Sequence, residues 1–267
     1  NNWARANGWS PNKVIIRMAY WLERLSYKRA KLINVLTPAF RDKLITAKNI
    51  PAEKIIFIPN AADFSISDEL VANNEQSDLR EKHGLQDKFI ITYVGAHGVA
   101  NCLGQVLDTA KLLQDTPAVI VLIGNGMEKQ GLIKRVADEQ LSNVILLDSV
   151  PKREVFKFIM SSDMGMSVLK KVDTFKTVYS NKTFDYFACK KPVFMAIDGV
   201  SRILVEEAKA GVYVEPENPQ DFAEKVRYYL QNPKLLAEQG QNGYTFAKAN
   251  FDRLVLAEKY LKQIQSF

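Results

Sequence analysis

The sequence has few of the residues that build metal sites and disulfide frameworks. Among 267 residues there are 2 histidines and 2 cysteines, and Cys102 and Cys189 lie too far apart for a CxxC pair. We therefore expect no metal site, no disulfide and a reducing, cytoplasmic setting. No apolar run approaches the roughly 20 residues that span a bilayer. The start, NNWARANGWS, has neither an initiator Met nor a signal-peptide pattern, and we expect it to be internal to a longer protein.

Charge is plentiful but unevenly distributed. The net charge is +6, yet residues 1–54 alone hold eleven Lys and Arg against three Asp and Glu, a net of +8. This asymmetry indicates an anionic partner for the N-terminal segment, and phospholipid at the inner face of the cytoplasmic membrane is the candidate. Nucleic acid is disfavoured, because the basic excess lacks interleaved aromatic residues and a recognised module.

Residues 14–31 are predicted to form an amphipathic helix. Its apolar face holds Ile15, Met18, Leu22 and Leu25. Its basic side chains are Lys13, Arg17, Arg24, Lys28 and Lys31. Two interpretations stay open for this helix: peripheral contact with an anionic membrane surface, and the solvated face of an ordinary domain helix.

Short elements follow this helix. We expect strands over 32–36 and 54–58, and between them a helix that begins at Pro38 and ends near Ala47. The stretch 64–77 is polar and has no clear periodicity, so it is expected to be a linker.

From residue 88 onward, short Val- and Ile-rich runs alternate with amphipathic segments. Strands are expected at 89–94, 119–123, 144–148, 164–169, 192–197 and 212–216. Helices are expected near 103–114, 127–140, 152–161, 181–190, 200–209, 219–230, 233–248 and 251–266. Continuous apolar strands separated by helices indicate a parallel sheet covered on both faces. The fold class is therefore α/β, with a Rossmann-like doubly wound parallel sheet.

In such a sheet ligands bind at the carboxyl ends of the strands, so the residues after each strand are candidates. Gly95, His97 and Gly98 follow the first strand, and Gly124 and Gly126 follow the second. Glycines here let a backbone approach a phosphate or sugar, but a tight strand-to-helix turn also needs them. The histidine could reach the ligand or be a hydrogen-bonded loop residue. The pattern is not GxGxxG, which disfavours a nicotinamide or flavin dinucleotide.

Val150 and Pro151 follow the third strand. The backbone edge there could pair with a nucleobase, since extended N–H and C=O groups mimic a pairing partner. In the simpler interpretation, Pro151 only presets the start of the next helix.

The segment after the fourth strand is the most specific feature. Lys170, Lys171 and Lys176 surround it, and Ser180 or Asn181 is expected to cap the helix that follows. Lys182 beside a helix N-terminus suits a diphosphate. Asp185, about one turn further on the same face, could accept both ribose hydroxyls. The alternative is a capped surface helix with an ion pair between Lys182 and Asp185.

These segments together resemble the family-four retaining glycosyltransferases. The branch that builds bacterial capsule, O-antigen and exopolysaccharide units, including L-fucosamine-transferase-like members, is the most similar. The likeness covers nearly the whole chain in order: KIIFIPNAAD (54–63), ITYVGAHGVANCLGQVLDTAKLL (91–113), VLIGNGMEKQGL (121–132), NVILLDSVPKREVFKFIMSSDMGMSVL (143–169), YSNKTFDYFACKKPVF (179–194) and GVYVEPENPQDFAEKV (211–226).

The resemblance implies a GT-B enzyme, in which two Rossmann-like domains bind a nucleoside diphosphate sugar between them. Sugar transfer would be metal-independent and of the hexosyltransferase type, with UDP as the expected nucleotide and GDP or another carrier left open. The family's second acidic position, which holds the ribose, falls on Asp185, whereas Thr177 occupies the first and is not acidic. The basic residues that usually follow the first strand are absent too, so Lys182 would carry more of the diphosphate charge.

The resemblance also implies a domain organisation. Residues 1–63 would be a helical and strand remnant of the N-terminal acceptor domain, and 64–87 a linker with the helix that leads into the next domain. Residues 88–250 would form the nucleotide-sugar-binding domain, and 251–267 a crossover helix. Without the rest of the acceptor domain, we expect the chain to be inactive alone. Two alternatives are a non-catalytic nucleotide-sugar-binding subunit and a nucleotide-sugar 2-epimerase of GT-B fold, the latter disfavoured by the scarcity of acid–base residues after strands.

Overall fold

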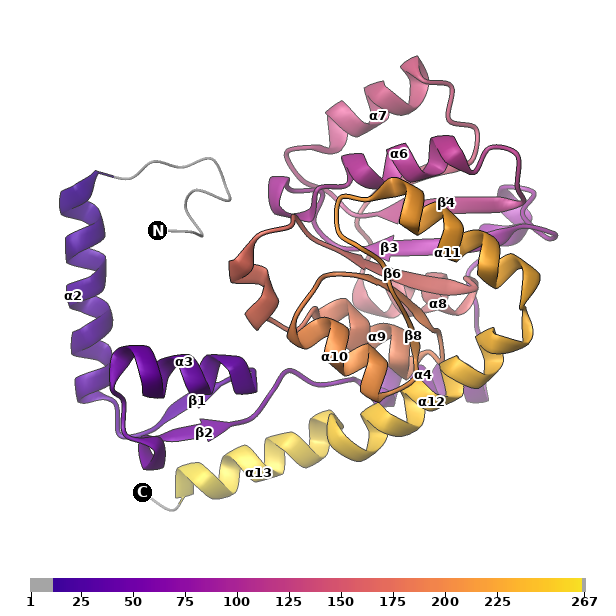
Figure 1. Cartoon of the computed structure of the whole chain (residues 1–267). Coiled ribbons are helices and arrows are strands. Elements are labelled where there is room, and N and C mark those ends of the chain that lie inside the picture. Colours follow the sequence, from indigo (N-terminus) through magenta and orange to yellow (C-terminus); the bar gives the residue numbers. More distant parts are fainter. Residues whose placement is uncertain (1–11, 266–267) are drawn as a thin grey trace.

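The computed structural model describes residues 12–265. Figure 1 shows a small N-terminal unit beside a larger α/β unit built on one sheet. The opening residues, NNWARANGWS, lie outside the described residues, so the expectation that they are internal to a longer protein stays untested.

The larger unit contains a parallel sheet of six described strands in the order β5-β4-β3-β6-β7-β8. These strands are β3 (Phe89–Val94), β4 (Ala118–Ile123), β5 (Val144–Leu147), β6 (Met164–Val168), β7 (Val193–Ala196) and β8 (Gly211–Tyr213). The strand order reverses at β3, which has β4 on one side and β6 on the other. The expected α/β fold is therefore confirmed, and the topological switch point lies between β3 and β6.

Helices cover both faces of the sheet, as Figure 1 shows. One face packs against α6 (Gly104–Leu112), α7 (Lys129–Asp138) and α11 (Pro219–Gln231). The other packs against α4 (Phe64–Ala72), α8 (Lys152–Met160), α9 (Asn181–Ala188), α10 (Val200–Glu207) and α12 (Lys234–Asn250). Every residue of β3 and β4 is buried as a result, which explains why these strands read as continuous apolar runs. Short helices α5 (Leu79–Lys82), η2 (Val99–Asn101) and η3 (Asp173–Thr177) complete the unit.

The stretch 64–77, expected to be an irregular linker, contains the helix α4. The buried face of this helix consists of Phe64, Ser67 and Leu70. The Ser67 hydroxyl donates a hydrogen bond to the Phe64 carbonyl. The expectation was wrong because the buried positions are three residues apart and one of them is a serine, so the sequence shows no regular spacing of apolar residues.

The N-terminal unit consists of α2 (Lys13–Arg29), β1 (Ile33–Val35), α3 (Pro38–Lys48), the short η1 (Ala52–Lys54) and β2 (Ile55–Phe57). Its buried apolar core is small and comprises Val35, Leu44 and Ile55. Lys31, expected on the first helix, lies beyond its end. Helix α2 buries none of its own residues, and no helix among residues 12–265 is long and apolar enough to cross a membrane.

The chain passes between the two units twice, near Ala62 and near Asp252, and backbone hydrogen bonds join these two segments at the crossing. The amide of Ala62 donates to the Phe251 carbonyl at 2.8 Å, and the amide of Arg253 donates to the Ala62 carbonyl at 3.2 Å. From there α13 (Arg253–Gln265) runs back toward β2, as Figure 1 shows. A further tie is made by the Thr37 hydroxyl, which donates to the Thr177 carbonyl at 2.7 Å.

Candidate functional site

Lys182, in the first turn of α9, lies at the topological switch point. Its ammonium is 4.9 Å from the centroid of the Tyr93 ring. A Cβ added to Gly95, which directly follows β3, would be 3.4 Å from the lysine Cε. Burial lowers the pKa of Lys182 to about 8, against the opposing effect of Asp185. The switch point thus presents a partly buried cation that stacks on an aromatic face, where it can pair with an anionic ligand.

Tyr186, one turn after Lys182, anchors α9 to the sheet. Its hydroxyl accepts a hydrogen bond from the Val94 amide at 3.2 Å and lies 3.0 Å from the Met166 carbonyl, so it joins β3 to β6. The ring packs directly on Gly165, where a Cβ would come within 2.4 Å of it. A glycine in β6 therefore lets the helix approach closely enough to place Lys182 at the crevice.

Ser180 occupies the N-cap position of α9, as expected, but it caps differently. Its hydroxyl does not accept from the helix amides and donates instead to the Ser167 hydroxyl at 3.1 Å. Asn181 is exposed, and its side-chain oxygen accepts from the Asn60 amide at 2.6 Å. The first helical turn is therefore tied to the segment that leaves the N-terminal unit.

Asp185 faces Lys152, whose ammonium lies 3.9 Å from its carboxylate. The ion pair with Lys182 that the sequence left as an alternative is not found among the described residues. Burial raises the pKa of Asp185 to about 6, although the charge of Lys152 acts to lower it. A quarter of the side chain, 25%, remains exposed.

The loops after β3 and β4 interlock through their backbones. The amide of His97 donates to the Asn125 carbonyl at 2.9 Å. A Cβ at Gly124 would lie 1.9 Å from the Gly95 carbonyl oxygen, and one at Gly126 would lie 2.4 Å from the His97 oxygen. Both glycines also have positive φ, 150° and 159°. Close backbone packing therefore already requires glycine at both positions, and a ligand contact there stays a prediction.

His97 is fully buried, at 0% exposure, and neither ring nitrogen has a hydrogen-bond partner among the described residues. Burial lowers its pKa to about 4, and the Lys129 ammonium acts in the same direction. That ammonium is itself buried and donates to the Gly124 and Leu147 carbonyls, each at 2.8 Å. The hydrogen-bonded loop histidine considered from the sequence is thus not observed, and contact of His97 with a ligand stays a prediction.

The remaining predicted positions line the same edge of the sheet. Gly98 precedes η2, Val150 is partly buried against the core, and Pro151 holds the N-cap of α8 with φ −56°. Pairing of a nucleobase with this backbone stays a prediction. Two lysines of the segment before α9 are engaged with carboxylates: Lys171 pairs with Glu215, and Lys176 lies 3.0 Å from Asp173.

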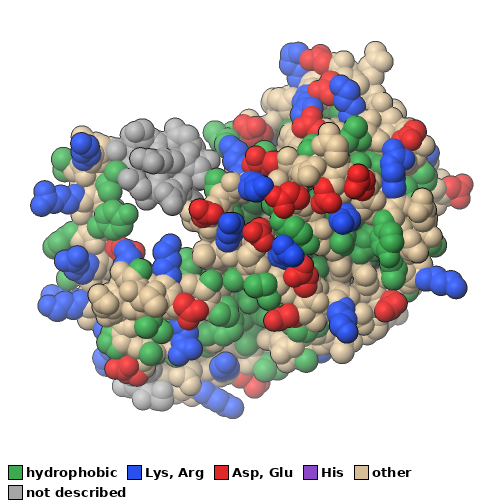
Figure 2. All heavy atoms as spheres, in the orientation of Figure 1, with side chains coloured by type: hydrophobic (Ala, Val, Ile, Leu, Met, Phe, Trp, Pro, Cys, Tyr) green, Lys and Arg blue, Asp and Glu red, His purple; other side chains and the backbone are tan. Residues whose placement is uncertain are grey.

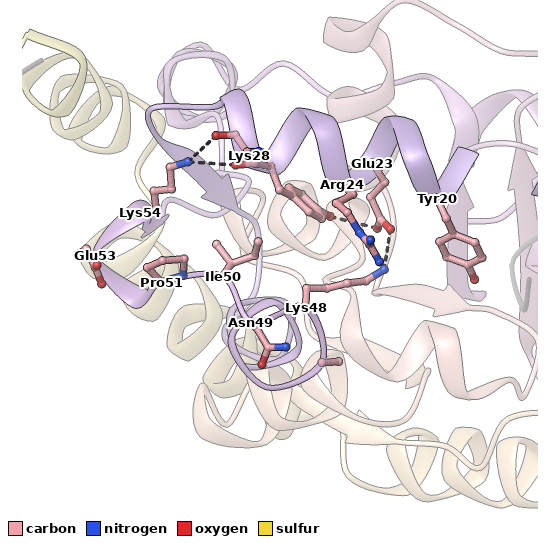
Figure 3. A pocket seen from close by; sticks show the side chains of 12 residues that line it. Tyr20, Glu23, Arg24, Lys28, Lys48, Asn49, Ile50, Pro51, Glu53 and Lys54 are labelled. Atoms are coloured by element: carbon pink, nitrogen blue, oxygen red, sulfur yellow. Dashed lines mark hydrogen bonds and ion pairs between the residues drawn. The ribbon is translucent and has the colours of Figure 1, made fainter. Parts of the chain in front are cut away.

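A cavity of 880 Å³ lies in the N-terminal unit, between α2 and the end of α3 (Figure 3). Tyr20 and Glu23 line it from α2, and Lys48 reaches across to Glu23 at 2.6 Å. Lys54 closes another side by donating to the Tyr27 carbonyl at 3.0 Å. All of its lining residues belong to the N-terminal unit, so the cavity is a separate feature from the switch point.

Residues at the site that sequence reasoning missed are Tyr93, Lys152 and Asp63. Tyr93 was treated only as part of a buried strand, although it is the aromatic face under Lys182. Lys152 follows Pro151 at a helix start, a place where a lysine is not expected to stabilise the helix dipole. A lysine at this unfavourable position was the one sign in the sequence that Lys152 has a role other than stabilising the helix.

The fold and this site define a Rossmann-like α/β protein with a cation and a carboxylate at its switch point. Residues 75–246, well over half of the chain, match the family Glycosyl transferases group 1. The chain belongs to the glycosyl transferases group 1 family.

Sequence relatives agree with this assignment, and a solved structure shares the fold. The chain is 22% identical over 244 residues to "Alpha-D-kanosaminyltransferase" of Streptomyces kanamyceticus, covering 90% of this chain and 61% of that protein. It is 25% identical over 233 residues to "Putative colanic acid biosynthesis glycosyl transferase WcaI" of Escherichia coli K12, covering 82% and 54%. The Anabaena protein Alr3699/HepE, solved with UDP-glucose, superposes with a TM-score of 0.76 at 17% identity, covering 91% of this chain and 66% of that one. The chain thus spans between about half and two thirds of the length of these proteins.

Proposed function

We propose that this chain is the donor-binding part of a retaining glycosyltransferase that takes its sugar from a nucleoside diphosphate sugar, with UDP as the carrier. The observation that carries the proposal is the position of Lys182 at the switch point, with Asp185 one turn further along α9. Its ammonium would stabilise the diphosphate as the leaving group gains charge, and the carboxylate would accept the ribose hydroxyls. The Anabaena structure with UDP-glucose supports the choice of nucleotide.

Titration calorimetry tests this proposal. We expect the chain to bind UDP or UDP-glucose more tightly than GDP, in buffer with EDTA, and Lys182→Ala to weaken binding at least tenfold. Lys190→Ala is the matched control, because Lys190 lies just beyond the other end of α9 and also stacks on a tyrosine ring at 4.9 Å, that of Tyr244. Absence of nucleotide binding by the folded chain, or equal losses in both variants, would contradict the proposal.

The sugar acceptor is proposed to be lipid-linked, in the synthesis of a bacterial capsule or O-antigen. The name of the Escherichia coli relative, a colanic acid biosynthesis glycosyl transferase, supports this role. A retaining transferase needs donor and acceptor held together, so we expect this chain to bind the donor without transferring the sugar by itself. An assay of transfer from UDP-glucose to water or to a lipid acceptor, which should show no product, checks that expectation.

Helix α2 is proposed to bring the enzyme to an anionic membrane. Val14, Met18 and Trp21 are 70%, 55% and 61% exposed on it. Figure 2 shows Lys and Arg side chains interspersed with hydrophobic ones on the α2 edge of the molecule. Vesicles rich in phosphatidylglycerol should sediment the chain, and Arg17→Glu with Arg24→Glu should reduce that binding. Equal sedimentation with phosphatidylcholine vesicles would contradict an electrostatic attachment.

A further inference from the structure

One lysine lies between two carboxylates from distant parts of the chain. The Nζ atom of Lys152 is 3.3 Å from Oδ2 of Asp63 and 3.9 Å from Oδ1 of Asp185. Asp63 in turn lies 2.7 Å from Nη1 of Arg253. The lysine ammonium also lies 5.5 Å from the centroid of the Phe156 ring.

These contacts join the crossing between the two units to the proposed ribose site. Ala62 and Asp252 form the parallel bridge at which the chain passes between the units. Asp63 and Arg253 are the residues that directly follow them. Asp185 lies on α9, about one turn after Lys182. Lys152, at the start of α8, is the side chain that contacts both carboxylates.

We propose that Lys152 is a positioning residue that keeps Asp185 ionised and links its charge state to Asp63 at the crossing. The proposal rests on the proposed function, in which Asp185 binds the ribose. An ionised carboxylate accepts a hydroxyl hydrogen bond on each of its two oxygens, whereas protonation turns one of these oxygens into a donor and weakens the acceptor strength of the group. The state of Asp185 therefore decides whether the ribose contact can form.

The charged groups that face Asp185 come from four elements. Lys152 on α8, Arg253 on α13 and Lys182 on α9 favour its charged form, whereas Asp63 disfavours it. Burial still raises its pKa to about 6, close enough to neutrality for one neighbouring charge to matter. Arg253 is directed to Asp63, so among residues 12–265 it is Lys152 that forms the ion pair with Asp185.

Carbon-13 NMR titration of the Asp185 carboxyl, in the full chain without ligand, tests this coupling. Lys152→Met keeps an unbranched side chain that is one heavy atom shorter and removes the charge. It should raise the pKa of Asp185 by about 1, the low end for an opposite charge within 4–6 Å. Lys152→Arg should restore the original value. Asp63→Asn removes a negative charge and should lower the pKa, so the two variants should move it in opposite directions.

Lys157→Met is the control, because Lys157 lies on α8 and pairs with Glu75 and Glu154. It should leave the Asp185 titration unchanged. An unchanged pKa in Lys152→Met, or shifts of the same sign in Lys152→Met and Asp63→Asn, would overturn the proposal.

Affinity for UDP-glucose at two pH values gives a second readout. Lys152→Met should lose at least threefold more affinity at pH 6.5 than at pH 8.5, because Asp185 is ionised at the higher pH in both proteins. An equal loss at both values would mean that the lysine acts only through the fold or through a direct contact, and would overturn the proposal. If the wild type binds no nucleotide sugar while the NMR shifts appear, the proposed function fails and the coupling stands.

Discussion

The ammonium of Lys182 lies 4.9 Å from the centroid of the Tyr93 ring, and this contact joins the first turn of α9 to β3. The ring stabilises the cation without neutralising it, in contrast to a carboxylate partner. Burial lowers the pKa of this lysine to about 8 and raises that of Asp185, one turn away, to about 6. The two groups therefore carry opposite charges together only in a limited pH range.

Affinity for UDP-glucose should be maximal between about pH 6 and pH 8, by calorimetry. As pH rises through about 8 the free protein loses the Lys182 proton, and as pH falls through about 6 Asp185 becomes protonated. Each limb should approach a tenfold loss per pH unit. Lys182→Arg should abolish the alkaline limb, because guanidinium stays charged in that range. An alkaline limb that persists in this variant would assign the titration to another group.

Removal of His97 should reduce the sensitivity of the fold to acid. The pKa of this histidine is about 4 in the folded protein against 6.5 for an unperturbed one, so its contribution to stability is present above 6.5 and is lost as pH falls toward 4. Between pH 7 and pH 5 this loss is about 2 kcal/mol. In urea titrations, His97→Phe should show an acid destabilisation smaller by that amount. An identical loss in both proteins would mean that the ring is protonated when folded.

Gly124→Ala should destabilise the protein by more than about 2 kcal/mol. Its Cβ would meet the Gly95 carbonyl oxygen at 1.9 Å, and its φ of 150° strains any side chain. Gly131→Ala on α7 is the control, because nothing lies within 4 Å of its Cβ. It should stabilise the helix by about 0.5–1 kcal/mol. Equal changes in melting temperature for the two variants would contradict the close backbone packing between the loops after β3 and β4.

Lys129→Met should cost about 2–3 kcal/mol of stability. The buried ammonium donates to the Gly124 and Leu147 carbonyls, which would be left without these donors. Asp148→Asn is the comparison, because this carboxylate is 84% exposed although it lies 2.6 Å from the same ammonium. This substitution should cost clearly less stability than Lys129→Met, because solvent screens an exposed ion pair. Chemical denaturation of the two variants separates carbonyl binding from the ion pair, and a larger cost for Asp148→Asn would reverse this assignment.

Elements with a local signature could be predicted from the sequence, and those without one could not. The buried runs that became β3 and β4 were located within a residue, because two-sided burial demands continuous apolar side chains. Strand β8 ends at Tyr213, earlier than the expected 216, since nothing in VYVEP marks the point at which pairing stops. Helix α4 was missed because its stripe includes Ser67, whose burial depends on its neighbours.

The sequence by itself determined the α/β class, the alternation of strands and helices, and the placement of Lys182 and Asp185 one turn apart at a helix start. These follow from periodicity and spacing, which act over a few residues. Only the tertiary structure decided that β3 lies beside β6, so that Tyr93 meets Lys182, and that Asp63, Lys152 and Asp185 share one cluster. Such contacts depend on the order of the strands and on where the chain crosses between the units. Two side chains about 90 residues apart in the sequence can be in contact although no local sequence pattern indicates it.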